Sequence, residues 1–231
     1  MNKPPLVTDA VLERSEVVAN NAMNRVRGIS GPNSYAKDLG FGPLAFLVER
    51  LGVQPRVAWL DLCCGTGRAL VQAASALRPY AGRFGITGVD LVPMFDVPPT
   101  GLSGIMLVTA AVGTWEPHAQ FDLITCVHGL HYVGDKLGLL CRAAGWLKPD
   151  GRLLAHLDLG NLRVVGDERR RHAWRAALQR AGFAYSSHRR LVTCTGPVAA
   201  AVPYRYVGAD AQAGPNCTGQ AAVDSWYVTA D

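Results

Sequence analysis

Short apolar runs recur through the middle of the chain, and segments with helical spacing separate them. We predict buried strands where the apolar runs are nearly continuous: 57–62, 84–89, 105–109, 121–127 and 152–159. We predict helices over 68–77, 135–147 and 167–181, and a sixth strand within 184–194. Strands that alternate with helices favour right-handed crossovers and a mostly parallel sheet. The pattern therefore predicts an α/β fold, a doubly wound, mostly parallel sheet with helices on both faces.

Prolines and glycines mark the connections between these elements. Pro93, Pro98 and Pro99 follow the second strand, so we predict a shortened or irregular crossover there. The run 148–151 is turn-forming. The stretch 196–222 is rich in Gly, Pro and Ala and is long for a connection, which favours a substrate loop. A final strand over 222–228 brings the predicted sheet to seven strands.

The first 56 residues follow a different pattern. Residues 9–26 show helical spacing, and a polar loop is predicted over 28–37. A short helix then begins near Pro43 and ends at Gly52. We interpret 1–56 as an N-terminal helical cap or lid, and 57–231 as the main domain.

Composition narrows the class of protein. A chain of 231 residues with 49% hydrophobic and 18% charged residues can bury one sizeable core. The net charge of +5 permits anionic partners, but we interpret the basic cluster 169–171 as a solvated helix face. No apolar run is long enough to span a bilayer, and no signal peptide is visible. The six cysteines form neither a disulfide framework nor a zinc motif, so we expect a cytoplasmic protein without a metal.

A glycine-containing motif ends the first predicted strand. Asp61 closes the strand, and Gly65 and Gly67 follow it before the next helix. Glycines allow a tight turn and close approach of a ligand, and the helix start presents free N–H groups. Because Leu70 stands where a dinucleotide site has its third glycine, a nicotinamide oxidoreductase is disfavoured. No phosphate-binding lysine follows, which excludes a P-loop.

A second acid stands at the end of the second predicted strand. Asp90 lies 29 residues after Asp61 (90 − 61), at the same edge of the predicted sheet. A carboxylate in that position can accept both hydroxyl groups of a ribose. The sequence therefore predicts a ligand that contains a ribose and binds at the ends of the first two strands.

Together these residues resemble motif I of the class I S-adenosylmethionine-dependent methyltransferases, and the likeness runs from about Val57 to Leu159. The resemblance implies a Rossmann-like fold that binds S-adenosylmethionine and releases S-adenosylhomocysteine. It assigns cofactor binding to these residues: Asp61, Cys63, Gly65, Gly67, Asp90, Leu91, Val112 and Tyr35. Cys63 stands at the motif's first glycine. The family often has an acid near 110–112 for the adenine amino group; here backbone atoms of Val112 would serve instead.

Candidates for chemistry follow the fourth and fifth predicted strands. Relatives often carry a histidine near the methyl donor, so His131, and secondly His128, are candidate general bases. The alternative is that both histidines only shape the pocket. A metal site is disfavoured because no third ligand is evident. Tyr132, Asp158 and Tyr204 are the candidate acceptor contacts.

The breadth of the family and the compact chain favour a small-molecule acceptor, methylated on O or N, which includes specialised natural products. A modified peptide, a nucleic acid and a non-catalytic S-adenosylmethionine-binding role stay open. Nucleic acid is disfavoured because His128 to His131 replace the Asn/Asp-Pro-Pro-Tyr/Phe run of the amino-methylating enzymes. A homo-oligomer is compatible with the sequence, which does not specify the attacked atom.

Overall fold

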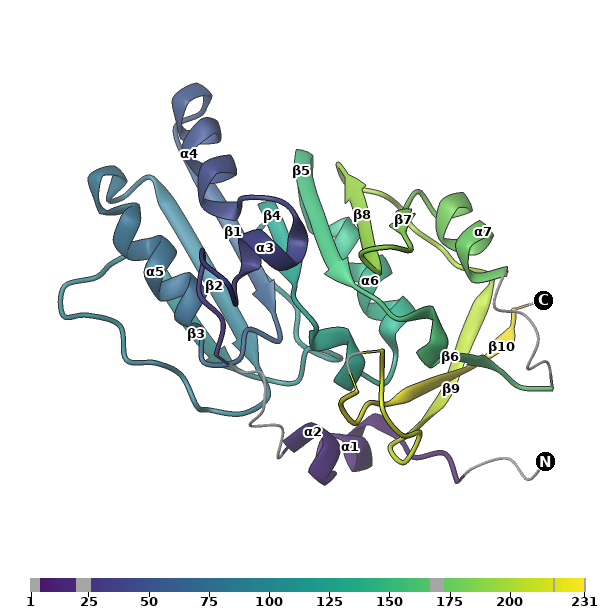
Figure 1. The fold of residues 1–231 in the computed structure, drawn as a ribbon. Coiled ribbons are helices and arrows are strands. Elements are labelled where there is room, and N and C mark those ends of the chain that lie inside the picture. The colour runs from purple at the N-terminus through teal and green to yellow at the C-terminus, as the bar shows by residue number, and fades with distance from the viewer. Residues whose placement is uncertain (1–4, 20–25, 167–172, 218, 231) are drawn as a thin grey trace.

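The computed structural model describes residues 5–19, 26–166, 173–217 and 219–230, and its centre is a seven-stranded sheet (Figure 1). The strand order is β3-β2-β1-β4-β5-β8-β7. Their bounds are β1 Val57–Leu62, β2 Phe84–Asp90, β3 Ile105–Thr109, β4 Phe121–Cys126, β5 Leu147–His156, β7 Ala184–Ser186 and β8 Leu191–Thr195. The first five strands in this order run parallel, and β8 is antiparallel to both of its neighbours. The predicted doubly wound, mostly parallel sheet is therefore confirmed.

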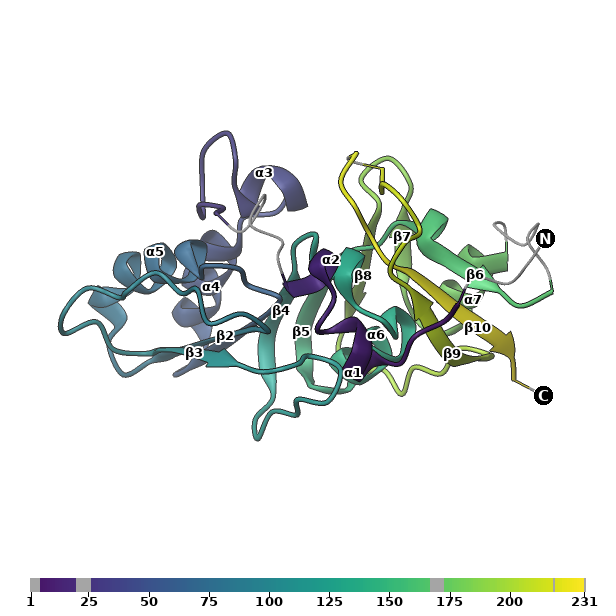
Figure 2. The same cartoon turned by 90° about the horizontal axis from the view of Figure 1, so that it is seen from below.

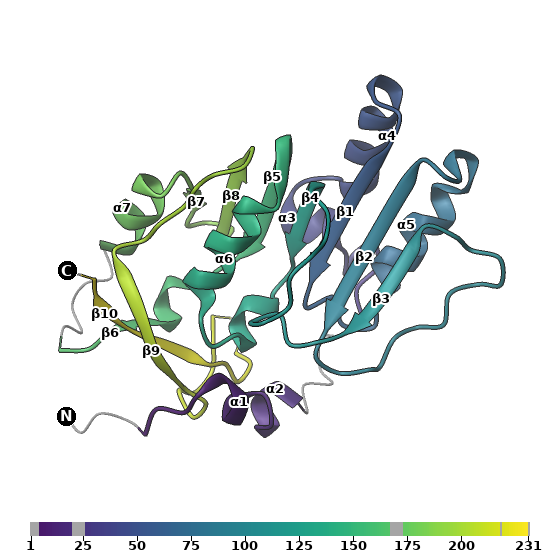
Figure 3. The same cartoon turned by 180° about the vertical axis from the view of Figure 1, so that it is seen from behind.

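Helices cover both faces of this sheet (Figures 1 and 3). One apolar core is shared by α3 Tyr35–Leu39, α4 Pro43–Val53 and α5 Arg68–Ala76. The other is shared by α6 Lys136–Gly145 and α7 Ala173–Arg180. Strand β1 is buried on both sides, because Trp59 packs in the first core and Leu60 in the second. None of the described helices is long and apolar enough to cross a membrane.

The connection between β2 and β3 contains no helix, as the prolines predict. Residues 91–104 form bends and turns. The described residues also contain the 3-10 helices η2 Arg78–Tyr80, η3 Gly129–Tyr132 and η4 Leu159–Asn161. Helix η3 comes after β4, and η4 comes after β5.

A second, three-stranded sheet was not predicted. Its order is β6-β10-β9, with β6 Leu162–Val164, β9 Tyr204–Asp210 and β10 Asp224–Thr229. The predicted final strand does form, as β10, but it pairs in this second sheet. The main sheet reaches seven strands because 184–195 holds a β7–β8 hairpin instead of the single strand that we expected. The stretch 196–222 is likewise not one loop, since β9 lies within it.

The N-terminal segment crosses to this second sheet. Helices α1 Asp9–Leu12 and α2 Glu16–Ala19 replace the single helix predicted over 9–26, and residues 20–25 lie outside the described ranges. Val7 forms an antiparallel bridge with Ala209 of β9. Figure 2 shows α1 beside the end of β9, distant in sequence but adjacent in space. The division of the chain at residue 56 stays a prediction.

Three further boundaries differ from the sequence prediction. Tyr35, predicted in a loop, opens α3, because the Ser34 hydroxyl accepts a hydrogen bond from the N–H of Lys37 and caps the helix. The predicted turn at 148–151 belongs to β5, where the pairing with β4 shifts register. Strand β5 ends at His156, so Asp158 lies beyond it. The predicted helix 167–181 is described only as α7, since 167–172 lie outside the described residues.

Candidate functional site

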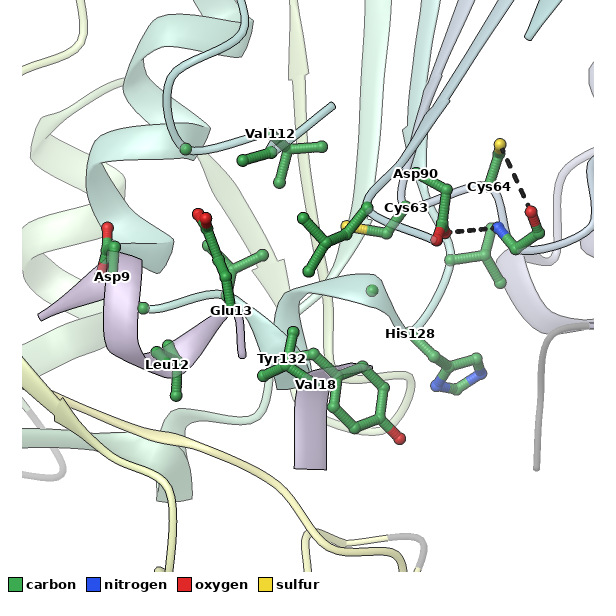
Figure 4. A pocket seen from close by; sticks show the side chains of 18 of the residues that line it. Asp9, Leu12, Glu13, Val18, Cys63, Cys64, Asp90, Val112, His128 and Tyr132 are labelled. Carbon is green, nitrogen blue, oxygen red and sulfur yellow. Dashed lines mark hydrogen bonds between the residues drawn. The ribbon is translucent and has the colours of Figure 1, made fainter. Parts of the chain in front are cut away.

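A pocket opens at the edge of the sheet where the first four parallel strands end (Figure 4). It encloses about 1000 Å³ of empty space including open solvent, a size usual for ligand sites. Its walls come from the N-terminal segment, α3, and the segments that follow β1, β2, β3 and β4. The predicted residues among them are Tyr35, Cys63, Gly65, Asp90, Leu91, Val112, His128 and Tyr132. The segment after β5 does not contribute, although we expected it to.

The turn after β1 has an unusual backbone. Cys63, Gly65 and Gly67 have φ angles of 57°, 60° and 71°, in the left-handed region that favours glycine. The Asp90 carboxylate accepts hydrogen bonds from the N–H of Gly65 at 2.8 Å and of Val92 at 3.1 Å. Asp90 therefore joins the ends of β1 and β2 and fixes the turn against the pocket.

Asp61 lies beneath this turn and not in the pocket wall. Its side chain is fully buried, and its two oxygens accept hydrogen bonds from the hydroxyls of Thr125 at 2.5 Å and Tyr35 at 2.6 Å. Thr125 in turn accepts from the Trp59 indole at 2.8 Å. Burial raises the pKa of Asp61 to about 7, an effect that the two hydroxyl donors oppose. Asp61 thus holds Tyr35, which does line the pocket.

His128 is the pocket histidine. Its backbone is left-handed, with φ 61°, at the start of η3. Its ring stacks on that of His156, with centroids 4.2 Å apart and planes 5° apart, and its Nε2 lies 3.6 Å from an oxygen of Asp38. Although burial opposes it, contacts with His128 and Arg27 lower the pKa of Asp38 to about 2. An ionised carboxylate therefore faces the side of His128.

His131 faces inward instead. It is 3% exposed and does not line the pocket, and its Nδ1 has no hydrogen-bond partner in the described part of the structure. Burial, and then the charge of His128, lower its pKa to about 3. Burial likewise lowers the pKa of His156 to about 4. Of the two predicted bases, His128 therefore has the accessible position, and His131 belongs to the wall behind it.

The three predicted acceptor contacts are not brought together. Tyr132 lines the pocket, and its hydroxyl lies 3.4 Å from the Gln220 amide oxygen. Asp158 caps η4 and accepts hydrogen bonds from the backbone N–H groups of Gly160 and Cys217. Tyr204, in β9 of the second sheet, packs against Trp174 of α7, with ring centroids 4.4 Å apart. Neither Asp158 nor Tyr204 lines the pocket.

The sequence analysis predicted an N-terminal cap but did not identify the two acids that this segment places in the pocket. Asp9, Glu13 and Arg27 line the pocket, and the two acids lie one helical turn apart. Arg27 donates to Asp38 at 2.7 Å. The only signal was the i, i+4 spacing of two acids beside an apolar Leu12, which surface helices also show. Among the described residues, no group of three His, Cys, Asp or Glu side chains is arranged to hold a metal ion.

The pocket combines a carboxylate and a glycine-containing turn with apolar and polar side chains. Asp90 supplies a carboxylate beside the glycine turn, and the absence of a Cβ at Gly67 and Gly88 lets Leu107 pack closely beneath it. Leu91 and Val112 supply apolar side chains to the pocket wall, and Tyr35 and His128 supply polar groups. These are the shapes and groups that an adenosine carrying a polar, charged substituent requires.

Solved structures of other proteins resemble this chain to different extents. Magnesium protoporphyrin IX methyltransferase from Synechocystis PCC 6803 is 15% identical and aligns with a TM-score of 0.50, over 84% of this chain and 100% of that one. YjhP from E. coli is 20% identical, with a TM-score of 0.41, over 63% of this chain and 54% of that one. CalS10, an amino pentose methyltransferase from Micromonospora echinaspora, is 24% identical, with a TM-score of 0.37, over 49% and 48%.

The chain spans about half the length of the first solved structures it matches, between 43% and 54%. A search of curated proteins gives no match. The family model described as a methyltransferase domain matches residues 36–192, which is more than half of the chain. This confirms the resemblance inferred from the sequence and, with it, S-adenosylmethionine as the cofactor. The chain therefore belongs to the methyltransferase-domain family and has the Rossmann-like fold of the class I S-adenosylmethionine-dependent methyltransferases.

Proposed function

We propose that this protein transfers a methyl group from S-adenosylmethionine to an oxygen or nitrogen atom of a small molecule, including a specialised natural product. The observation that carries the proposal is the convergence in one pocket of Asp90, the glycine turn and His128, each from the end of a different parallel strand. Ligands of doubly wound sheets bind at that edge.

The pocket residues suggest how the cofactor lies. Asp90 lines the pocket at the end of β2, and a carboxylate in that position can accept hydrogen bonds from the hydroxyls of a ribose. The reacting end of the cofactor belongs near His128 and Tyr35, on the β4 side. Asp61 acts through Tyr35, whose hydroxyl it holds at 2.6 Å. The cofactor itself supplies the activated methyl group, so the main task of the protein is to align the acceptor.

His128 is our candidate base, in preference to His131. It lines the pocket, and Asp38, 3.6 Å from its Nε2, faces the charge that His128 gains when it takes a proton from the acceptor. The parallel stack with His156 restrains rotation of the ring. This role applies to an acceptor that must lose a proton; an acceptor that is already nucleophilic needs only alignment.

The pocket walls favour a small acceptor with apolar surface. Leu12 and Val18 from the N-terminal segment line the pocket, and Tyr132 of η3 lies beside Val18 and packs against the same apolar cluster (Figure 4). Apolar walls with a few polar groups are typical of sites for small molecules. A modified peptide whose side chain enters the same space is the second candidate.

The proposal is tested first by binding and then by turnover. Calorimetry should show micromolar binding of S-adenosylhomocysteine and no comparable binding of NAD. Release of S-adenosylhomocysteine is then measured with panels of small hydroxylated, phenolic and amine acceptors and with short modified peptides. Tighter binding of NAD than of S-adenosylhomocysteine contradicts the proposal. Cofactor binding without turnover on any acceptor in these panels contradicts the small-molecule part of it.

A further inference from the structure

We infer that Glu13, at the end of α1, accepts a hydrogen bond from the exocyclic amino group of the cofactor's adenine. The inference rests on the proposed function, because it assumes that S-adenosylmethionine occupies the pocket. It assigns base recognition to the N-terminal segment, which lies outside the matched residues 36–192.

The strand order fixes which end of the pocket receives the base. Asp90 ends β2, which lies between β3 and β4 in the strand order, while Val112 follows β3 and His128 follows β4, on opposite sides of Asp90. If the reacting end lies toward β4, the adenine lies toward β3. The side chains there, Leu91 and Val112, are apolar and can flank a flat ring, but neither accepts a hydrogen bond.

Glu13 is the acceptor at that end. It lines the same pocket as Val112 and Gly113, and Figure 4 shows its side chain extending from α1 toward the loop that carries Val112. The residue is half-buried, and its side chain forms no hydrogen bond or ion pair with another described residue. Burial, and then the charge of Asp9, raise its pKa, an effect that a hydrogen-bond donor at this position opposes.

Asp9, the other acid of α1, attaches the helix to neighbouring segments. One of its oxygens accepts the hydroxyl of Tyr206 at 2.6 Å, and its carboxylate packs against Gly134, where a Cβ would lie 2.1 Å away. Val7, two residues earlier, exchanges backbone hydrogen bonds with Ala209 at 2.9 and 3.0 Å. The second sheet thus holds α1 across the pocket and orients Glu13. The carboxylate of Asp9 is engaged by Tyr206, whereas the carboxylate of Glu13 faces the pocket.

The test varies both the nucleobase of the ligand and the side chain at position 13. Calorimetry compares S-adenosylhomocysteine with S-inosylhomocysteine, in which a carbonyl oxygen replaces the amino group, for wild type, Glu13→Ala and Glu13→Gln. Wild type should bind the adenosyl ligand at least about 10-fold more tightly, since a charged acceptor recognises the donor and repels the carbonyl. Glu13→Ala should lose about 10- to 100-fold in affinity for the adenosyl ligand. Glu13→Gln should bind both ligands similarly, because an amide can rotate to accept from one or donate to the other.

Glu16→Gln is the matched control. It removes the same charge from the neighbouring exposed position on α2 and should leave the preference between the two ligands unchanged. Thermal denaturation checks that all variants fold. A preference in Glu13→Ala equal to that of wild type overturns this inference while leaving the proposed function intact. Failure of wild type to bind either ligand instead overturns the proposed function, and this inference with it.

Discussion

Replacement of Asp61 by Asn removes a carboxyl group that burial disfavours as an anion. Burial raises the pKa of Asp61 from 3.8 to about 7. Between these values the unfolded chain releases the proton and the folded protein retains it, so wild-type stability falls as pH rises from about 4 to 7. The difference between these two pKa values, 7 − 3.8 = 3.2, corresponds to about 4 kcal/mol of stability. We therefore expect the unfolding free energy of Asp61→Asn, relative to that of wild type, to increase by about 4 kcal/mol as the pH is raised from 4 to 8.

The difference is measured by urea unfolding at pH 4, 6 and 8, followed by tryptophan fluorescence. At pH 4 both side chains are neutral, so the difference there reflects only the changed hydrogen bonds to Thr125 and Tyr35, about 1 kcal/mol. Asp122→Asn is the control. Asp122 is buried in the neighbouring strand, but Gln54 and Lys148 lower its pKa against the effect of burial, so its variant should show no such trend above pH 5. If the Asp61→Asn difference is the same at all three pH values, Asp61 is ionised in the fold and the reasoning is refuted.

Three further predictions test the pocket and its support. Asp90→Ala should weaken S-adenosylhomocysteine binding by about 2–3 kcal/mol in calorimetry, and unchanged affinity in a folded variant would remove Asp90 from the ribose position. His128→Ala should lower turnover by about 10²–10⁴-fold at saturating cofactor, while His131→Ala stays within a few-fold; a larger effect at His131 would reverse our assignment. Lys136→Met should lower the unfolding free energy by about 3 kcal/mol, since the buried Lys136 ammonium donates to two backbone carbonyls and to Ser225. Chemical denaturation measures that loss. If amide hydrogen exchange around β10 is no faster in Lys136→Met than in wild type, Lys136 does not anchor that strand.

Much of the main sheet could be predicted because the signals are local. Each of the first five strands coincides with an apolar run, and the prolines at 93, 98 and 99 suppress the helix between β2 and β3. The second sheet could not be predicted in the same way. Strand β10 pairs with β6 and β9, which lie far from it along the chain, so its partners depend on tertiary packing.

The residues of the candidate site show the same difference between local and tertiary signals. Asp90 and the glycine turn could be predicted because each stands directly at a strand end. The choice between His128 and His131 could not be predicted, because both residues follow β4. The left-handed backbone at His128 and the short turn of η3 direct the His128 ring to the pocket and the His131 ring to the interior. Glu13 escaped prediction because its place depends on the bridge between Val7 and Ala209.

That bridge has a consequence for biosynthesis. Ribosomes deliver the chain from its N-terminus, so the segment that covers the pocket emerges long before β9, to which it attaches. The seven-stranded sheet ends at Thr195 and has all of its strands before β9 leaves the exit tunnel. Until β9 has also left the tunnel, Val7 lacks the backbone partner that holds the N-terminal segment across the pocket, so this side of the pocket stays uncovered after the main sheet has emerged.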